Sequence, residues 1–195
     1  MSQRLIWLGG AILIPLILLV AWLQQFRPLQ AQAFAVDVSN TILVDAVMYD
    51  GYEINDLDEA VALRNTGNED VDLSGWFLKD GEATDAKLPQ GTQLLPGEII
   101  WVTKNKDAFF RQFGFLPDVI VTTWPRLANQ GDELILADSQ HQVVDILVYG
   151  NGDVTHFDWS GPAVQPYSAG GLFGKEGQIL YRKREQGSGL PQGGI

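Results

Sequence analysis

Residues 126–150 read RLANQGDELILADSQHQVVDILVYG, and this stretch decides the fold. It contains two apolar runs, Leu134–Ala137 and Val143–Tyr149, separated by the polar loop Asp138–Gln142. Two short apolar runs joined by such a loop predict an antiparallel β-hairpin. The segment NQGD (129–132) in front of the first run predicts a tight turn before a strand.

The same pattern extends upstream to Thr41. The other apolar runs, each closed by a turn rich in Gly, Pro, Asn or Asp, are TILVDAVMYD (41–50), DEAVALRNTG (58–67), VDLSGWFLKDG (71–81) and LPGEIIWVTKN (95–105). Their close spacing predicts an all-β, immunoglobulin-like sandwich of two antiparallel sheets. Residues 106–113 (KDAFFRQF) place three phenylalanines on one side and predict one short helix.

Composition limits the classes of function. The chain has 195 residues, a formal net charge of −11 and no cysteine, which excludes disulfides and thiol chemistry. Between Asp37 and Asp158 there are 22 acidic and 7 basic residues. Because affinity for nucleic acid depends on neutralising phosphates with Lys and Arg, we expect no nucleic-acid partner.

Residues 5–23 (LIWLGGAILIPLILLVAWL) form an uninterrupted apolar segment. A helix of this length spans roughly 28 Å, which matches the hydrocarbon core of a bilayer. Trp7 and Trp22 lie near its ends, and Arg4 precedes it, which favours a cytoplasmic N-terminus of residues 1–4 and an extracytoplasmic body. The segment predicts a single-pass membrane protein that contacts lipid through this helix.

A cleaved signal peptide is the alternative. Ala31–Ala33 (AQA) resembles a cleavage site, so a soluble mature protein would begin near Phe34. The apolar run is longer than the usual 7–15 residues of the apolar region of a signal peptide, and the ten residues 24–33 separate Leu23 from the candidate cleavage point after Ala33. Both features favour a retained anchor followed by a tether over residues 24–38.

The order of these segments resembles the lamin-tail domain. The resemblance is carried by ILVDAVMYDG, DEAVALRNTG, VDLSGW, LPQGTQLLPGE, RLANQGDELILAD and VVDILVYG. It covers roughly residues 41–150, and we place the domain at 39–150 with a Gly- and Pro-rich C-terminal extension at 151–195. It departs from the family at Ala60 and Ala62, where members often carry bulkier residues.

The resemblance implies a non-catalytic scaffold that binds a partner protein, which could be an accessory subunit of a membrane complex. The alternative is the targeting domain of a truncated or split surface hydrolase, of the phospholipase-D-like or nuclease kind, because bacterial lamin-tail domains often accompany such enzymes. Fold alone does not assign chemistry.

No catalytic motif accompanies the fold. His156 lacks a lysine two residues later, so the H-x-K motif of phospholipase-D-like enzymes is absent, and His141 lies in the predicted hairpin loop. There is no G-x-S-x-G and no H-E-x-x-H. We therefore expect neither an enzyme nor a cofactor.

An acidic loop, DGYEINDLDE (50–59), is the one candidate for a small ligand. Hard cations such as Ca²⁺ bind six to eight oxygen atoms, mostly from carboxylates and carbonyls. The loop does not follow the EF-hand spacing, so a solvated acidic loop is the alternative to a weak Ca²⁺ site. The candidate ligands are Asp50, Glu53, Asp56, Asp58 and Glu59.

Two further features have structural interpretations. Trp76 and Trp101 are predicted in the core, since sandwiches bury aromatic side chains between their sheets. The basic cluster Arg182–Arg184 is interpreted either as a solubilising edge or as a contact with the acidic body or with anionic headgroups.

Overall fold

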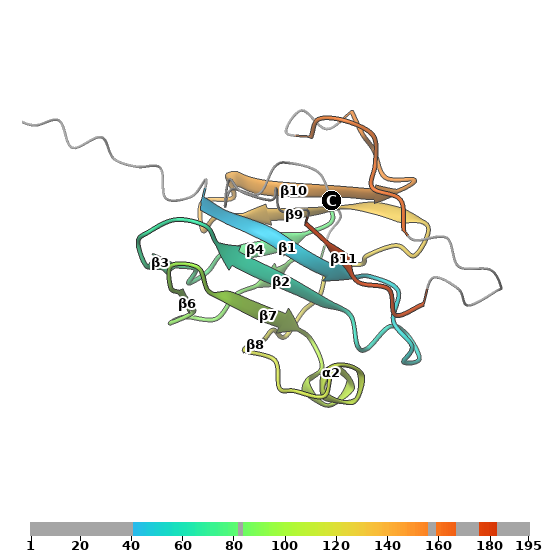
Figure 1. The fold of residues 1–195 in the computed structure, drawn as a ribbon, viewed down its shortest axis with the longest axis horizontal. Coiled ribbons are helices and arrows are strands. Elements are labelled where there is room, and N and C mark those ends of the chain that lie inside the picture. The colour runs from blue at the N-terminus through green and yellow to red at the C-terminus, as the bar shows by residue number, and fades with distance from the viewer. Residues whose placement is uncertain (1–40, 82–83, 156–158, 167–175, 183–195) are drawn as a thin grey trace, which may run out of the picture. The chain divides into compact units, whose positions relative to one another are not determined.

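A computed structural model describes residues 41–81, 84–155, 159–166 and 176–182. The named elements in these residues are all strands except for one α-helix (Figure 1). The elements are β1 (Ile42–Met48), β2 (Ala60–Asn65), β3 (Val71–Asp72), β4 (Phe77–Lys79), β5 (Ala86–Lys87), β6 (Gln93–Leu94), β7 (Ile99–Thr103), α2 (Lys106–Phe113), β8 (Val119–Ile120), β9 (Gly131–Ala137), β10 (Val143–Gly150) and β11 (Leu180–Tyr181).

The strands form two main sheets and one small ribbon. The first sheet has the order β11-β1-β2-β7-β8, the second has the order β10-β9-β4-β5, and β3 pairs with β6. The predicted hairpin of β9 and β10 is confirmed, with Leu147 opposite Leu134. All strand pairs are antiparallel except β7 and β8, which run parallel. The predicted antiparallel sandwich is therefore right except at this edge.

The core lies between the two sheets. Alternate residues of each strand face it, as expected for sheets that bury one face each. The largest fully buried side chains in this core are Tyr49, Tyr149, Ile42, Leu63, Leu73, Leu78, Leu88, Leu94, Leu134 and Leu136. Trp76 is also buried there, as predicted.

Trp101 differs from its prediction. Its neighbours Ile100 and Val102 face the core, so the alternation of the strand turns Trp101 to the outer face of the first sheet. It is half-buried there beneath α2, 5.0 Å from the ring of Phe113 between centroids. The prediction that Trp101 belongs to the sandwich core is wrong, because α2 supplies a second aromatic cluster.

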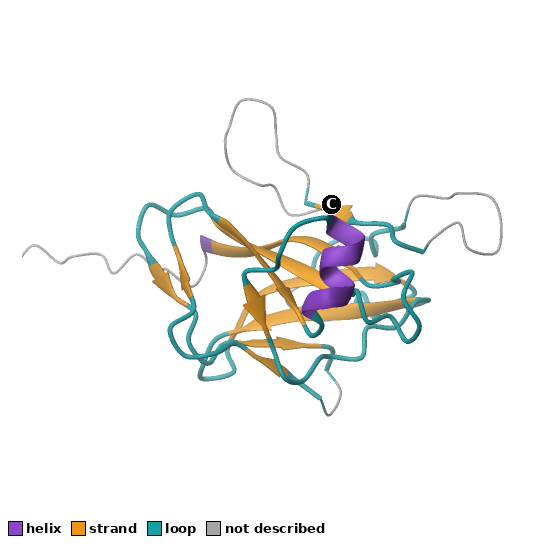
Figure 2. Ribbon diagram, turned by 90° about the horizontal axis from the view of Figure 1, so that it is seen from below, coloured by secondary structure: helices purple, strands orange, loops and turns teal. Residues whose placement is uncertain are grey.

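Helix α2, the purple coil in Figure 2, begins and ends where its sequence indicates. The side chain of Asn105 accepts hydrogen bonds from the backbone N–H groups of Asp107 and Ala108, which caps the first turn. Gly114 ends the helix with a φ of 77°, a left-handed conformation that glycine adopts without strain. The helix predicted over residues 106–113 is confirmed.

The predicted C-terminal extension contributes to the sandwich. Leu180 pairs with Val47 and Tyr181 with Ala46, so β11 covers the edge of β1. Upstream, Val164 forms an isolated bridge with Tyr149. Strands that contact the body therefore continue beyond residue 150.

The loops of the sandwich gather at two opposite ends. At one end, β1, β7 and β10 finish and β2 and β9 begin. We call this the distal end. At the other end, the Thr66 N–H donates to the carbonyl of Thr41, where the described residues begin. Since β1 connects one end to the other, Thr41 and the distal loops lie a strand length apart.

Several predictions fall outside the described residues. These are the cytoplasmic residues 1–4, the membrane helix over residues 5–23, the tether over 24–38, His156 and the basic residues Lys183 and Arg184. Among the residues that are described, none of the helices has the length and apolar character needed to cross a bilayer.

Candidate functional site

The acidic loop is held together by its own carboxylates. Asp58 is fully buried and accepts hydrogen bonds from the backbone N–H groups of Tyr52 and Glu53 at 3.0 and 3.1 Å. Asp56 accepts one from the Gly51 N–H at 3.0 Å. These bonds shape the loop in the way that Asx turns do, with carboxylate oxygens in place of backbone acceptors.

The other three carboxylates connect the loop to its surroundings. Glu53 forms an ion pair with Arg111 of α2, with 2.5 Å between Oε1 and Nε. The Asn129 amide donates to Asp50 at 2.9 Å. The Lys104 ammonium lies 3.2 Å from Glu59 Oε2.

The five predicted ligands thus bind different protein donors instead of facing one point. In the part of the sequence that the structure describes, no three His, Asp or Glu side chains are arranged to hold a metal ion. The geometry favours a structural role for the loop, and Ca²⁺ binding stays a prediction that titration calorimetry would test.

A polar cleft of about 560 Å³ lies beside this loop at the distal end, and we call it the end cleft. It brings together three regions that the sequence separates: the acidic loop, the residue after β7 and the segment before β9. It is lined by Asn55, Asp56, Glu59, Lys104, Trp124, Pro125, Arg126, Leu127, Ala128 and Asn129.

Glu59 and Lys104 form the polar base of this cleft. Glu59 is only 4% exposed, and burial raises its pKa to about 8, although the neighbouring Lys104 opposes the rise. Burial thus favours the protonated form of this carboxyl, whereas the Lys104 ammonium favours the carboxylate. The backbone carbonyl of Glu59 accepts from the Thr103 hydroxyl at 2.8 Å, which fixes the start of β2 against the end of β7.

Trp124 forms the inner wall. Its side chain is 8% exposed, and Nε1 is buried without a hydrogen-bond partner. The indole is close enough to Glu59 to contribute to lowering the pKa of that carboxyl, but the two groups do not meet in hydrogen-bond geometry. The Glu59 carboxyl is therefore the acceptor toward which this indole donor is directed.

The segment that carries Trp124 is fixed by two long-range hydrogen bonds. The Arg126 N–H donates to Asp80 Oδ2 at 2.6 Å. The hydroxyl of Tyr149, which is fully buried, donates to the carbonyl of Ala128 at 3.1 Å. The wall of the end cleft is thereby attached to both β10 and the turn after β4.

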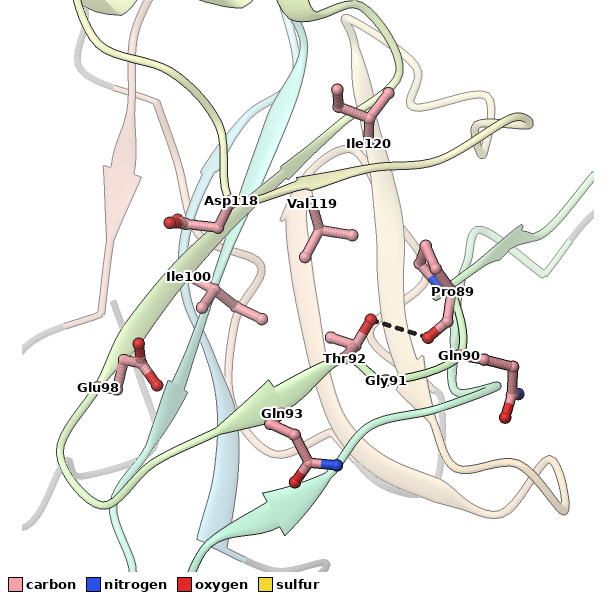
Figure 3. A pocket seen from close by; sticks show the side chains of 10 residues that line it. All are labelled: Pro89, Gln90, Gly91, Thr92, Gln93, Glu98, Ile100, Asp118, Val119 and Ile120. Atoms are coloured by element: carbon pink, nitrogen blue, oxygen red, sulfur yellow. Dashed lines mark hydrogen bonds between the residues drawn. The ribbon is translucent and has the colours of Figure 1, made fainter.

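A second cleft, of about 410 Å³, opens at the side of the sandwich among β6, β7 and β8 (Figure 3). Its polar groups are used locally: the Thr92 hydroxyl donates to the Pro89 carbonyl, Asp118 accepts from the Trp101 N–H, and Glu98 accepts from the Leu95 N–H. The end cleft is the better candidate, because it brings a buried carboxyl, an ammonium and a tryptophan together from three separate segments.

The sequence indicated only part of this site. The acidic loop and the NQGD turn were recognised, and the structure brings both to the end cleft. Lys104, Trp124 and Arg126 were missed. One feature of the sequence could have indicated this cleft. Trp124-Pro125 lies in a stretch without strand periodicity, and a large aromatic side chain in a loop packs against another part of the protein.

Comparison with known families agrees with this fold. Residues 36–151, more than half of the sequence, match the family described as Lamin Tail Domain. No curated protein matches the sequence at a significant level.

Proposed function

Because the chain belongs to the lamin tail domain family, we propose that it is a membrane-anchored, extracytoplasmic scaffold that binds a partner protein with its distal end. The family is one of non-enzymatic, immunoglobulin-like domains, and such domains serve as protein-interaction modules. Residues 5–23 would supply the anchor.

Exposed apolar side chains at the distal end carry this proposal. Ile54 is 82% exposed, Tyr52 62% and Phe110 49%. Tyr52 and Ile54 are the sequence neighbours of Glu53, and Phe110 precedes Arg111, so the ion pair between Glu53 and Arg111 brings the two segments that carry them together. We call Tyr52, Ile54 and Phe110 the apolar rim. Apolar groups that cluster on a surface, with polar residues around them, are typical of protein-binding sites.

The course of β1 supports the same choice of surface. The described residues begin at Thr41, at the end of the sandwich opposite the apolar rim. The rim and the end cleft are therefore the part of the sandwich farthest along β1 from Thr41.

Membrane anchoring is tested by extraction and N-terminal sequencing. A protein with a retained helix should resist alkaline carbonate, require detergent for release, and begin at or near Met1. Soluble mature protein beginning near Phe34 would contradict the anchor, although the interaction module would stand.

Partner binding is tested by gentle detergent extraction of the full-length protein followed by identification of stoichiometric co-purifying proteins. Ile54→Asp should abolish recovery of the partner, because it places a charge in the centre of a contact that excludes water. Leu95→Asp is the matched control, since Leu95 is 51% exposed at the opposite end. Equal recovery from both variants would contradict docking at the distal end.

A further inference from the structure

The acidic loop holds its most exposed apolar side chain in a braced conformation. The fully buried Asp58 accepts hydrogen bonds from the N–H groups of the two residues that precede Ile54. Directly after Ile54, Asn55 and Asp56 adopt left-handed backbone conformations, with φ of 61° and 50°, which Asn and Asp tolerate. Ile54 is therefore exposed on a fixed loop. A surface that is fixed in advance loses less entropy when a partner binds.

Tyr52 is supported from a second side. A Cβ atom on Gly177 would collide with the ring of Tyr52, so the ring lies directly against this glycine. The Gly177 N–H donates to the carbonyl of Asp50 at 2.6 Å, which attaches the segment to the acidic loop. Together with the ion pair from Glu53 to α2, these contacts make the apolar rim a preformed surface.

The charge at the distal end is predominantly negative. Residues 50–59, 104–113, 124–133 and 150–153 contain nine acidic and four basic residues, and the acidic loop itself contains no basic residue. Two of the four bases pair within the protein, Arg111 with Glu53 and Lys104 with Glu59. Seven acidic residues then stand against two basic ones in these ranges.

This charge decides which kind of partner suits the apolar rim. Nucleic acid and anionic headgroups are negatively charged, and a second copy of the chain has the same net charge of −11, so each of them is repelled. A protein segment that contains Lys or Arg is attracted. The opposite end also has acidic residues, such as Glu69 and Asp70, so the apolar rim selects the end and the charge selects the chemistry of the partner.

We propose that the distal end binds a basic, apolar segment of the partner protein. An apolar side chain of the segment packs against the apolar rim, and neighbouring Lys or Arg side chains face the carboxylates of the acidic loop and of Asp107. This inference rests on the proposed function and names the chemistry that is recognised. Asp107 precedes Phe110 by three residues in α2, so the two lie on the same side of the helix.

The complex should weaken with salt. Charges on an exposed surface are screened when the Debye length becomes shorter than their separation. The apolar contact is not weakened in this way, because it does not depend on charge. Binding should therefore fall several-fold between about 0.05 and 0.5 M NaCl without being abolished.

The test identifies the partner segment that contacts position 54. A photoreactive residue replaces Ile54 in the full-length protein in its native membrane, and mass spectrometry after digestion identifies the crosslinked peptide. Basic residues should outnumber acidic ones by at least two within about five positions of the attachment point, a length of roughly 8–17 Å that is comparable with the Debye length. An apolar residue should lie at or next to that point.

Two charge reversals separate local attraction from the effect of net charge. Asp107→Lys should lower the yield of this crosslink by about fivefold or more, because it places a cation beside the apolar rim. Glu69→Lys is the matched control, since it changes the net charge equally but lies in an exposed turn at the opposite end. Asp107→Asn should give a smaller loss in the same direction, and circular dichroism verifies that each variant is folded.

Several outcomes would contradict recognition of a basic segment. These are a crosslinked segment without an excess of basic residues, a crosslink to lipid or to a second copy of the chain, a yield that does not change with salt, and an equal loss in Asp107→Lys and Glu69→Lys. A dominant protein crosslink from position 54 to a segment that is not basic, with none from position 95, would leave the proposed function standing. Absence of any specific crosslink from position 54 would contradict both.

Discussion

The guanidinium of Arg182 forms a buried ion pair with Asp145, with 2.5 Å between Nη2 and Oδ2. Arg182 Nε donates to the Val44 carbonyl at 2.9 Å, and the Val44 N–H donates to the same oxygen of Asp145 at 2.7 Å. Residues from β1, β10 and the end of β11 therefore meet at one point. This network closes the side of the sandwich where the two sheets approach each other.

Replacing Arg182 should destabilise the domain strongly. Arg182→Met leaves the Asp145 carboxylate buried without its cation, and breaking such a pair costs about 3–5 kcal/mol. Burial already raises the pKa of Asp145, an effect that Arg182 opposes. The free energy of unfolding from urea denaturation measures the loss.

Arg111→Met is the matched control for this experiment. Arg111 lies 2.5 Å from Glu53, the same separation as in the buried pair, but its side chain is 56% exposed against 7% for Arg182. Solvent-exposed pairs contribute little to stability. An equal loss in both variants would show that the Arg182 network does not join the sheets.

Glu59→Gln should change how stability depends on pH. The folded pKa of about 8 lies above the ordinary value, so the stabilisation associated with protonated Glu59 is present at low pH and is lost as pH rises through about 8. Each pKa unit corresponds to about 1.4 kcal/mol. Relative to the wild type, the variant should gain a few kcal/mol between about pH 5 and pH 9, measured by urea denaturation at both values. A constant difference would contradict a buried, protonated Glu59.

Tyr149→Phe should loosen the wall of the end cleft. The substitution removes the hydroxyl that donates to the Ala128 carbonyl, which costs about 1 kcal/mol. Hydrogen exchange of residues 124–130 should accelerate. Tyr181→Phe is the control, because Tyr181 is 55% exposed and should leave both stability and exchange of this segment unchanged.

Asn105→Ala should weaken helix α2. The variant loses the amide that accepts from the Asp107 and Ala108 N–H groups, at a cost of about 1 kcal/mol. The thermal midpoint should fall, and Trp101 fluorescence should report the change because its ring packs on Phe113. Lys106→Ala, an exposed change one residue away, should have no such effect.

Local sequence signals predicted the strands well. Glycine at the turns and alternation along 134–149 indicated the hairpin, and Asn105 with Gly114 marks the ends of the helix. These features depend on neighbouring residues, so the sequence carries them directly. The side on which Trp101 is buried could not be read in this way, because it depends on where α2 packs.

The sequence does not show which residues far apart in the chain contact each other in the folded protein. The basic residue Arg182 was interpreted either as a solubilising edge or as a contact with the acidic body, and the structure confirms the contact through Asp145, 37 positions away. The end cleft similarly combines Glu59, Lys104 and Trp124, which lie on separate loops. Nothing in the spacing of these residues indicates that they meet.

The most direct test of the central claim is site-specific photo-crosslinking of the full-length protein in its native membrane. A photoreactive residue at position 54, where Ile54 is 82% exposed in the distal loop, should give one dominant crosslinked protein. The same residue at position 95, at the opposite end, should give none. Crosslinks of equal yield from both positions, or from position 95 alone, would contradict binding of a partner through the distal end.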